Sequence, residues 1–216
     1  MMISSPIHKQ RRNQVTYFMT SLLDIVPTIL DWYNIPYTNE ALNNNEVSLP
    51  NLTGRSLIPL LINESKEERS IFASQTHHEV TMYYPMRVVR TKRYKLIHNL
   101  NYKMPFPIDQ DLYVSPTFQD VLNRTYKKQP LPWYKTLNSY YQRPEWELYD
   151  LKYDPEERHN IFSKPSMKNT TIDLQKQLFD WQKVTKDPWL CAPHGVLQNS
   201  GDYVDNPQCM PLYNLE

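Results

Sequence analysis

The chain has 216 residues, is 40% hydrophobic and 12% aromatic, and carries a net charge of +1. This composition supports a buried core, excludes wholesale disorder and gives no electrostatic reason to expect nucleic acid or an anionic membrane surface as a partner. Only three glycines occur in the whole chain, which excludes a glycine-rich phosphate-binding loop.

The first predicted element is a helix that begins at Asp24, whose carboxylate can cap the free amide hydrogens. Pro27 then lies in the first turn, where its missing N–H costs nothing. The helical period places an apolar face on Ile25, Ile29 and Trp32. A polar, asparagine-rich loop is expected over residues 38–50, followed by a turn and a short apolar segment over 52–61.

A small β-sheet is predicted for the middle of the chain, with strands at 70–74, 87–91, 94–99 and 146–151. The proline-rich span 101–144 is too long for an empty loop, and a short helix is expected near 117–123. A second clear helix is predicted over 172–184, with Leu174, Leu178 and Trp181 on one face. The tail from residue 187 onward shows no period and is expected to be irregular.

Two adjacent histidines and a glutamate, His77, His78 and Glu79, lie ahead of a basic strand. Successive side chains of a strand point to opposite faces, so the two histidines cannot both bind one ion from an extended backbone. His77 and Glu79 have the i, i+2 spacing of strand ligands, but no second His or Cys cluster completes a tetrahedral site. Three interpretations stay open: a metal site, a strand end with satisfied imidazoles, or the border of a substrate pocket with one histidine facing it.

Charged residues gather in two places. Five cations lie within nine residues, and they form either a solvated hairpin or a surface for a polyanionic sugar: Arg87, Arg90, Lys92, Arg93 and Lys95. Six acidic residues follow later, and turn chemistry together with hairpin ion pairs explains them: Glu145, Glu147, Asp150, Asp154, Glu156 and Glu157.

Two late cysteines and four Asn-x-Ser/Thr sequons favour the secretory pathway. The sequons are Asn51, Asn63, Asn123 and Asn169. Cys191 and Cys209 are expected to form a disulfide, which would stabilise the fold by about 3 kcal/mol, with two free thiols as the alternative. The first residues contain no apolar segment of the signal-peptide kind, and a chain that lacks its true N-terminus would reconcile these observations.

Several strings of the sequence resemble the sulfatase family. "SLLDIVPTILDWYNIP" and "LTGRSLIPLL" are similar to a sulfatase helix and the turn that follows it. "VVRTKRYKLI" and "ELYDLKYDPEERHNI" are similar to the hairpin, strand and turn of the sulfatase C-terminal subdomain. "SQTHHEVTMYYPMR" and "DPWLCAPHGVL" narrow the resemblance to sulfamidases of this family. Cys191 is not expected to be the family's nucleophile, because Gly195 stands where the motif has arginine.

The resemblance covers nearly the whole chain but only the C-terminal part of a sulfatase, and it implies an α/β fold with an α+β C-terminal part. Residues 1–68 would form the last elements of an incomplete, alkaline-phosphatase-like α/β domain, and residues 69–216 a subdomain with a small antiparallel sheet and a packed helix. The implied activity is that of a lysosomal hydrolase that removes N-linked sulfate from the glucosamine of heparan sulfate. The alternatives are an O-sulfatase of the same superfamily and a non-catalytic, heparan-binding paralogue.

The family's calcium ligands and its formylglycine match no position here, so we expect no catalytic or metal-binding residue in this chain and no activity from it alone. The candidate substrate-binding residues are His77, His78, Glu79 and Arg87, placed by the resemblance at the wall of the pocket. The implied partners are a sulfated glycosaminoglycan and the missing N-terminal catalytic part, with a homodimer as an option. No nucleic acid or membrane partner is expected.

Overall fold

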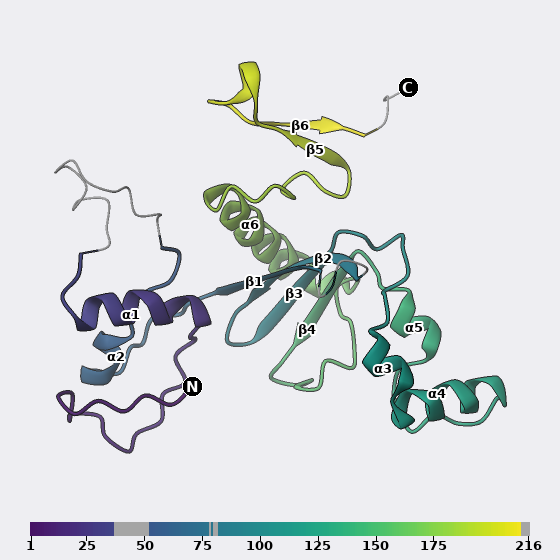
Figure 1. Ribbon diagram of the computed structural model, residues 1–216, viewed down its shortest axis with the longest axis horizontal. Coiled ribbons are helices and arrows are strands. Elements are labelled where there is room, and N and C mark those ends of the chain that lie inside the picture. The colour runs from purple at the N-terminus through teal and green to yellow at the C-terminus, as the bar shows by residue number, and fades with distance from the viewer. Residues whose placement is uncertain (37–51, 78, 80–81, 213–216) are drawn as a thin grey trace. The chain divides into compact units, whose positions relative to one another are not determined.

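The computed structural model describes residues 1–36, 52–77, 79 and 82–212 (Figure 1). The chain divides into two compact units, Met1–Ile71 and Phe72–Glu216, and each is described by itself. In the described ranges, no helix has both the length and the apolar character needed to cross a membrane. The assignment of residues 1–68 to the end of a larger α/β domain stays a prediction.

The first unit contains the 3-10 helix η1 (Leu22–Asp24) and the helices α1 (Ile25–Trp32) and α2 (Ile58–Ile62). The expected role of Asp24 as the cap of α1 is wrong, because its side chain makes no capping bond to that helix. Its carboxylate is fully buried and accepts hydrogen bonds from both Arg69 terminal nitrogens at 2.7 Å and from the backbone N–H of Ser21 and Arg55. Burial raises the pKa of Asp24, but these hydrogen bonds outweigh it and hold the pKa below its ordinary value.

Gly54 is required where the chain passes close to η1. A Cβ atom added at Gly54 would lie 1.9 Å from the carbonyl oxygen of Leu23, so no other residue fits without a backbone shift. The predicted apolar face of α1 is largely uncovered, since Ile25 is 41% and Ile29 51% exposed. Within this unit, the Asp24 carboxylate joins η1 to Arg55 and Arg69 through hydrogen bonds, while Leu57 and Pro27 are buried.

The second unit is built on a four-stranded sheet in the order β1 (Ile71–His77), β2 (Tyr83–Arg90), β3 (Tyr94–Asn99) and β4 (Trp146–Asp150). The pairs β2–β3 and β3–β4 are antiparallel, which confirms the predicted sheet. The long helix α6 (Lys168–Val184) packs against it (Figure 1), with Leu174 and Leu178 in one core cluster with Val89, Leu96 and Leu148.

Three short helices occupy the proline-rich span between β3 and β4: α3 (Gln110–Val114), α4 (Pro116–Tyr126) and α5 (Leu137–Tyr141). The Ser115 side chain caps α4 by accepting a hydrogen bond from Phe118 N–H at 3.2 Å, and Pro116 occupies the first helical position. Thr136 caps α5 in the same way through Ser139 N–H. Only one helix was expected in this span. Each of the three observed helices begins after a residue whose side chain caps it: Asp109, Ser115 and Thr136.

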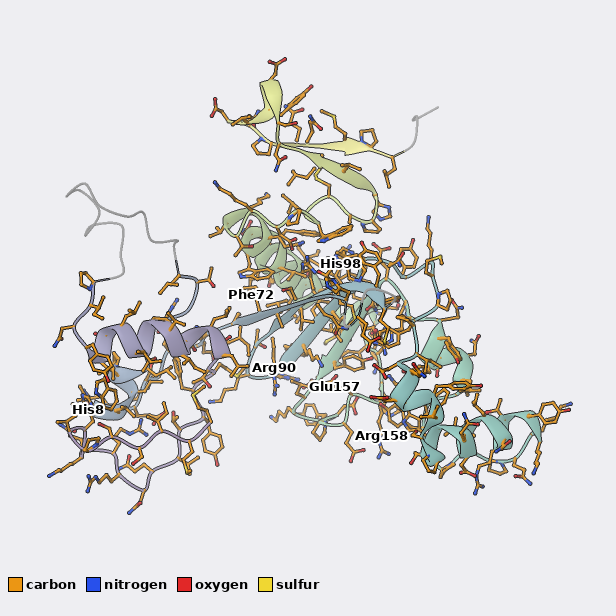
Figure 2. All side chains as sticks on the ribbon, in the orientation of Figure 1. His8, Phe72, Arg90, His98, Glu157 and Arg158 are labelled. Atoms are coloured by element: carbon orange, nitrogen blue, oxygen red, sulfur yellow. A yellow bond between two sulfur atoms is a disulfide. The ribbon has the colours of Figure 1, made fainter. Side chains whose placement is uncertain are left out.

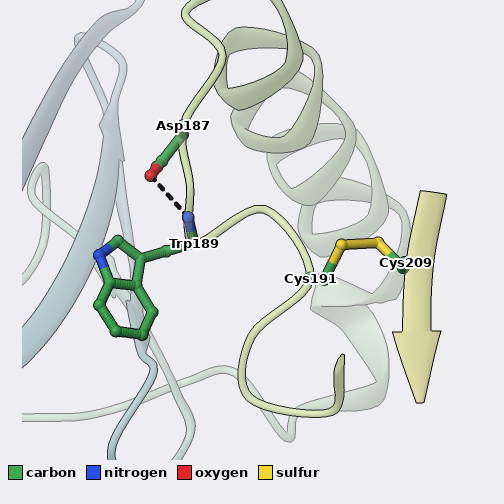
Figure 3. The surroundings of a disulfide bond; sticks show 4 residues. All are labelled: Asp187, Trp189, Cys191 and Cys209. Carbon is green, nitrogen blue, oxygen red and sulfur yellow. Dashed lines mark hydrogen bonds between the residues drawn. A yellow bond between two sulfur atoms is a disulfide. The ribbon is translucent and has the colours of Figure 1, made fainter. Parts of the chain in front are cut away.

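The tail departs from the predicted irregular structure. After the 3-10 helix η3 (Pro165–Met167) and α6, the strands β5 (Gly195–Gln198) and β6 (Gln208–Pro211) form an antiparallel hairpin, with η4 (Gly201–Tyr203) between them. The expected disulfide is present: Cys191 and Cys209 are bonded, with Cα atoms 5.4 Å apart (Figure 3). The bridge brings the segment before β5 against β6 and thereby supports the register of the hairpin.

A buried ion pair joins β2 to the segment that follows α6. Arg87 on β2 is 4% exposed, and its Nη2 donates to Asp187 Oδ1 at 2.9 Å. Asp187 also accepts from the backbone N–H of Trp189 at 3.0 Å (Figure 3). The Gln182 side-chain amide donates to the same carboxylate, also at 3.0 Å. Burial raises the pKa of Asp187, but the bonds from Arg87, Trp189 and Gln182 lower it overall. The Arg87 Nη1 donates to the carbonyls of Gln75 and Met86, so the guanidinium holds three segments together.

A second buried polar cluster lies around His98 on β3 (Figure 2). The imidazole stacks on Trp146 at a centroid distance of 3.7 Å, and its Nε2 lies 3.5 Å from Glu145 Oε1. His194, in the tail, reaches the same oxygen with its Nε2 at 3.3 Å. Burial lowers the pKa of His98 to about 4, against the raising effect of Glu145, while His194 and Arg87 lower it further.

The Arg87–Asp187 pair predicts a large and asymmetric mutational effect. Asp187→Ala leaves a buried guanidinium without its counter-ion and is expected to lower the free energy of unfolding by about 3–5 kcal/mol. The double variant Arg87→Met/Asp187→Leu removes both charges and should cost much less. Urea denaturation of the three proteins measures this. Asp180→Ala, which breaks the exposed pair of α6 with Lys176, is the control and should have a far smaller effect. Equal losses for Asp187→Ala and Asp180→Ala would contradict the assignment.

His98 predicts a loss of stability at mildly acidic pH. Its pKa is about 4 in the folded chain, below the ordinary 6.5, so the unfolded state takes up the proton first as the pH falls. The free energy of unfolding should therefore fall by about 2 kcal/mol from this group between about pH 6.5 and pH 5. His98→Phe keeps a ring against Trp146 and should lose that part of the pH dependence, measured by denaturant unfolding at both pH values. An unchanged pH dependence in the variant would show that other groups cause it.

Candidate functional site

The candidate site is a cleft of about 430 Å³ beside the end of β1. Its volume lies within the range of sites that bind small molecules, about 300–1,000 Å³. Residues of β1, the position just before β2, the loop before α3, α3 itself and α5 line it: Gln75, His77, Met82, Phe106, Pro107, Asp109, Leu112 and Tyr140. We name it the β1 cleft.

Local sequence signals position the walls of the β1 cleft. Gln75 and His77 are two residues apart on β1, so their side chains leave the strand on the same side. Asp109 is the N-cap of α3, and its Oδ1 accepts a hydrogen bond from Asp111 N–H at 2.7 Å. Phe106 N–H donates to the Tyr141 carbonyl at 2.7 Å, which fixes the loop against α5.

Phe106 is held firmly in this wall. Its ring meets the buried Tyr84 edge to face at 5.0 Å, and the Arg143 guanidinium lies 3.7 Å from its centroid. Tyr140, a neighbour of Phe106 at 5.7 Å, has its pKa raised by burial and opposed by Arg143, so its hydroxyl stays protonated and can donate. The cleft therefore offers a preformed wall with apolar faces and polar edges.

The chemistry of the β1 cleft suits recognition more than bond breaking. An imidazole, a carboxylate, an amide and a phenol surround apolar surface from Met82, Phe106 and Leu112. Such a set can bind hydroxyl groups and pack against the C–H face of a ring. Within the part of the chain that the structure describes, no group of three or more His, Cys, Asp and Glu could hold a metal ion. We derive no metal-dependent step from these residues.

The four candidate substrate-binding residues from the sequence differ in position and exposure. His77 lines the β1 cleft from the exposed end of its strand. Glu79 is exposed just beyond β1 and does not line the cleft, and His78 lies outside the described residues. Arg87 is buried in its pair with Asp187, so we place it among the groups that hold the fold, and the substrate contact considered for it does not fit this geometry.

Of the residues that line the β1 cleft, only His77 was singled out in the sequence, and Asp109 and Tyr140 are two of the polar side chains that were missed. Asp109 carried a usable signal, because an aspartate before a short helical segment is a typical N-cap. Tyr140 carried none, since it reaches the cleft through the packing of α5 against the Phe106 loop. Both depend on the placement of the 101–144 span, which has no clear hydrophobic period.

The charged clusters form ion pairs between the hairpin and the β4 region. Arg93 pairs with Asp150 and Lys95 with Glu157, each at 2.7 Å. Glu147 accepts from the Asn99 amide at 2.7 Å, and Asp154 accepts from the backbone N–H of Arg158 and His159 in its turn. The explanation of the acidic stretch by turn chemistry and hairpin ion pairs is confirmed. Much of the basic charge of the hairpin is thereby neutralised.

The structure shows the exposure of three of the four sequon asparagines. Asn63, Asn123 and Asn169 are exposed, while Asn51 lies outside the described residues. Exposure permits a glycan to be attached but does not establish it, so glycosylation at all four positions stays a prediction.

Comparison with known proteins gives matches in sequence and in structure. The family model described as "N-sulphoglucosamine sulphohydrolase, C-terminal" matches residues 127–184. Human N-sulphoglucosamine sulphohydrolase is 51% identical over 214 residues, which are 99% of this chain and 41% of the human protein. An ulvan-active sulfatase of Formosa agariphila is 30% identical over 63% of this chain and 25% of its own length.

A solved protein in complex with its substrate D-glucosamine-2-N,6-O-disulfate aligns with a TM-score of 0.46 and 25% identity, over 76% of this chain and 24% of that protein. The chain thus spans less than half the length of these relatives. The predicted resemblance to sulfatases is confirmed: nearly the full length of this chain is similar to human N-sulphoglucosamine sulphohydrolase, and residues 127–184 match the model of the C-terminal part of such proteins.

Proposed function

We propose that this chain acts as the C-terminal portion of a sulfamidase-type hydrolase that removes N-linked sulfate from the glucosamine of heparan sulfate. The observation that carries the proposal is the 51% identity to human N-sulphoglucosamine sulphohydrolase over 99% of this chain. The match extends over nearly the whole chain and is not restricted to one motif. It therefore favours a function in common with the human protein over a likeness of fold alone. Because the chain spans 41% of the human protein, the activity is proposed for the whole protein to which such a portion belongs.

In this proposal the β1 cleft is a wall of the substrate pocket. His77 stands at its exposed edge. Its ring N–H would donate a hydrogen bond to a sulfate or carboxylate of the sugar chain. The Tyr140 hydroxyl and the Gln75 amide would bind sugar hydroxyls, and Phe106 would pack against the ring.

The reactive groups that the family implies are assigned to the rest of the protein. Formylglycine and calcium would come from that part, because the family's sequence motifs for both match no position of this chain. The exposed apolar face of α1, with Ile25 and Ile29, supports the proposal that residues 1–68 end a larger α/β domain. The disulfide and the exposed sequons support passage through the secretory pathway to the lysosome.

The first prediction from this proposal concerns turnover. The 216-residue chain by itself should release no sulfate from N-sulfated glucosamine. A chimera in which it replaces the matching portion of the human relative should release sulfate, and should prefer N-sulfated over 6-O-sulfated glucosamine. Turnover by the isolated chain would contradict the assignment of the reactive groups. A chimera that folds and cleaves only 6-O-sulfate would favour the O-sulfatase alternative, and one that folds and cleaves neither would favour a non-catalytic role.

The second prediction concerns His77. In the active chimera, His77→Ala removes one hydrogen-bond donor to a charged group of the substrate, a bond worth roughly 1.5–3 kcal/mol. The catalytic efficiency, kcat/KM, should fall by about ten- to a hundredfold at acidic pH, with the melting temperature unchanged. His159→Ala is the matched control, because His159 is an exposed histidine in the turn after Asp154 and lies outside the β1 cleft. Equal kinetics for the two variants would remove His77 from the proposed wall.

A further inference from the structure

A second cleft of about 520 Å³ lies at the end of α4 and the beginning of α5. Its lining includes Lys128, Gln129, Trp133, Tyr134, Lys135 and Asn138, and it shares no lining residue with the β1 cleft. No acidic residue lines it. We name it the α4–α5 cleft.

We propose that the α4–α5 cleft binds a short stretch of an anionic saccharide, of the sulfated or uronate-bearing kind, as a site separate from the β1 cleft. Binding here would anchor a polysaccharide chain at a second point without contributing to the reaction. The inference goes beyond the proposed function, because it assigns a ligand to a surface that the hydrolysis of N-linked sulfate does not require.

The aromatic residues supply the surface on which a sugar ring packs. Trp133 and Tyr134 are neighbours with ring centroids 6.0 Å apart, and Trp133 rests against Tyr140 at 5.8 Å. Tyr134 keeps 48% of its surface exposed. A pyranose ring presents a face of C–H bonds, and an aromatic face backed by other rings is a rigid, amphipathic support for such a face. Gln129 and Asn138 offer side-chain amides that can bind hydroxyl groups on the rim.

The cations select for a negatively charged ligand. Lys135 lies near the Tyr134 ring, with its Nζ 5.8 Å from the centroid. Arg158 also lies near this ring, at 5.6 Å, but it pairs with Glu156 and is not among the lining residues, so the lysines are the cations that the cleft offers. Neither Lys128 nor Lys135 forms an ion pair with any residue that the structure describes. Burial lowers the pKa of Lys135, and Arg143 lowers it further, against the raising effect of Glu147 and Glu157. The net effect disfavours the charged amine, so an anion bound directly beside it would stabilise the charge.

The α4–α5 cleft is also well formed before any ligand arrives. Gln129 N–H donates to the Arg124 carbonyl at 2.8 Å and Lys128 N–H to the Thr125 carbonyl at 3.1 Å, which closes the end of α4. On the other side, Thr136 caps α5. A loop anchored at both ends loses little conformational freedom on binding, so weak individual contacts contribute more of their energy to affinity.

The hairpin is the competing location for an anionic saccharide, and it is less suitable. Arg87, Arg93 and Lys95 are each engaged with a carboxylate, which leaves Arg90 and Lys92 as the exposed hairpin cations outside these three ion pairs. The hairpin offers exposed charge alone, whereas the α4–α5 cleft combines unpaired lysines with a concave aromatic surface. Substitutions in each location can therefore show which of them binds the saccharide.

The experiment measures binding of a heparin-derived tetrasaccharide to the full 216-residue chain by titration calorimetry at two salt concentrations. Lys135→Gln should weaken binding by about three- to tenfold and reduce its dependence on salt, because one screened charge contact is lost. Tyr134→Ala should weaken binding by a similar factor at both salt concentrations, because a packing contact is lost. Lys92→Gln, the matched control on the hairpin, should bind as the unmodified chain does.

The same tetrasaccharide without sulfate groups should bind more weakly to the unmodified chain. The proposal is overturned if the chain does not bind heparin tetrasaccharide, if Lys92→Gln weakens binding as much as Lys135→Gln, or if only His77→Ala weakens it. Melting temperatures of all variants identify any that fail to fold, and Lys135→Gln, at a partly exposed position, remains informative if Tyr134→Ala does not fold. This measurement is of binding alone, so it can succeed or fail independently of sulfate release by the chimera.

Discussion

The second unit depends on one buried contact, the pair of Arg87 with Asp187, which lie 100 residues apart in the chain. Two charges removed from water are tolerated only when their hydrogen bonds are satisfied. Here the carboxylate accepts from Arg87, Gln182 and Trp189, while the guanidinium also donates to two carbonyls. The pair fixes the direction in which the chain leaves α6, and so it sets where the disulfide-linked hairpin begins. A neutral pair of apolar residues could fill the space but would not impose that direction.

The same sheet serves two surfaces of different character. At the free end of β1, His77 faces a cleft whose walls come from the loop and helices inserted between β3 and β4. Farther along that insertion, the α4–α5 cleft opens without any strand in its lining. The insertion is short of regular core contacts and rich in aromatic side chains, and capping serines and threonines order it locally. Substitutions on the surface of this insertion can therefore occur without disturbing the core that α6 and the strands share.

The sequence predicted those elements whose signals are local. The strands 94–99 and 146–151 and the helix 172–184 have clear periods, and the structure contains β3, β4 and α6 at nearly these positions. The sequence also held a signal that Arg87 is buried. Pro85, Arg87 and Val89 are spaced two residues apart, and all three lie on the buried side of β2. The partner could not be predicted, since Asp187 lies in a tail without periodicity. The β5–β6 hairpin was missed for a related reason: its strands are only four residues long, too short for a visible alternation.

The neighbouring elements of the sheet also explain why His77 is exposed and His98 is buried. His77 and His98 both lie on strands of one sheet, yet one ends its strand in water and the other is covered by Trp146 and Phe179. Burial keeps His98 neutral through most of the mildly acidic range, so it contributes packing without charge until the pH approaches 4. His77 is exposed at the end of its strand, so its ring nitrogens are free to meet a ligand in the β1 cleft. A sequence pattern shows both as histidines in strands, and only the position of α6 and β4 decides which one can bind a ligand.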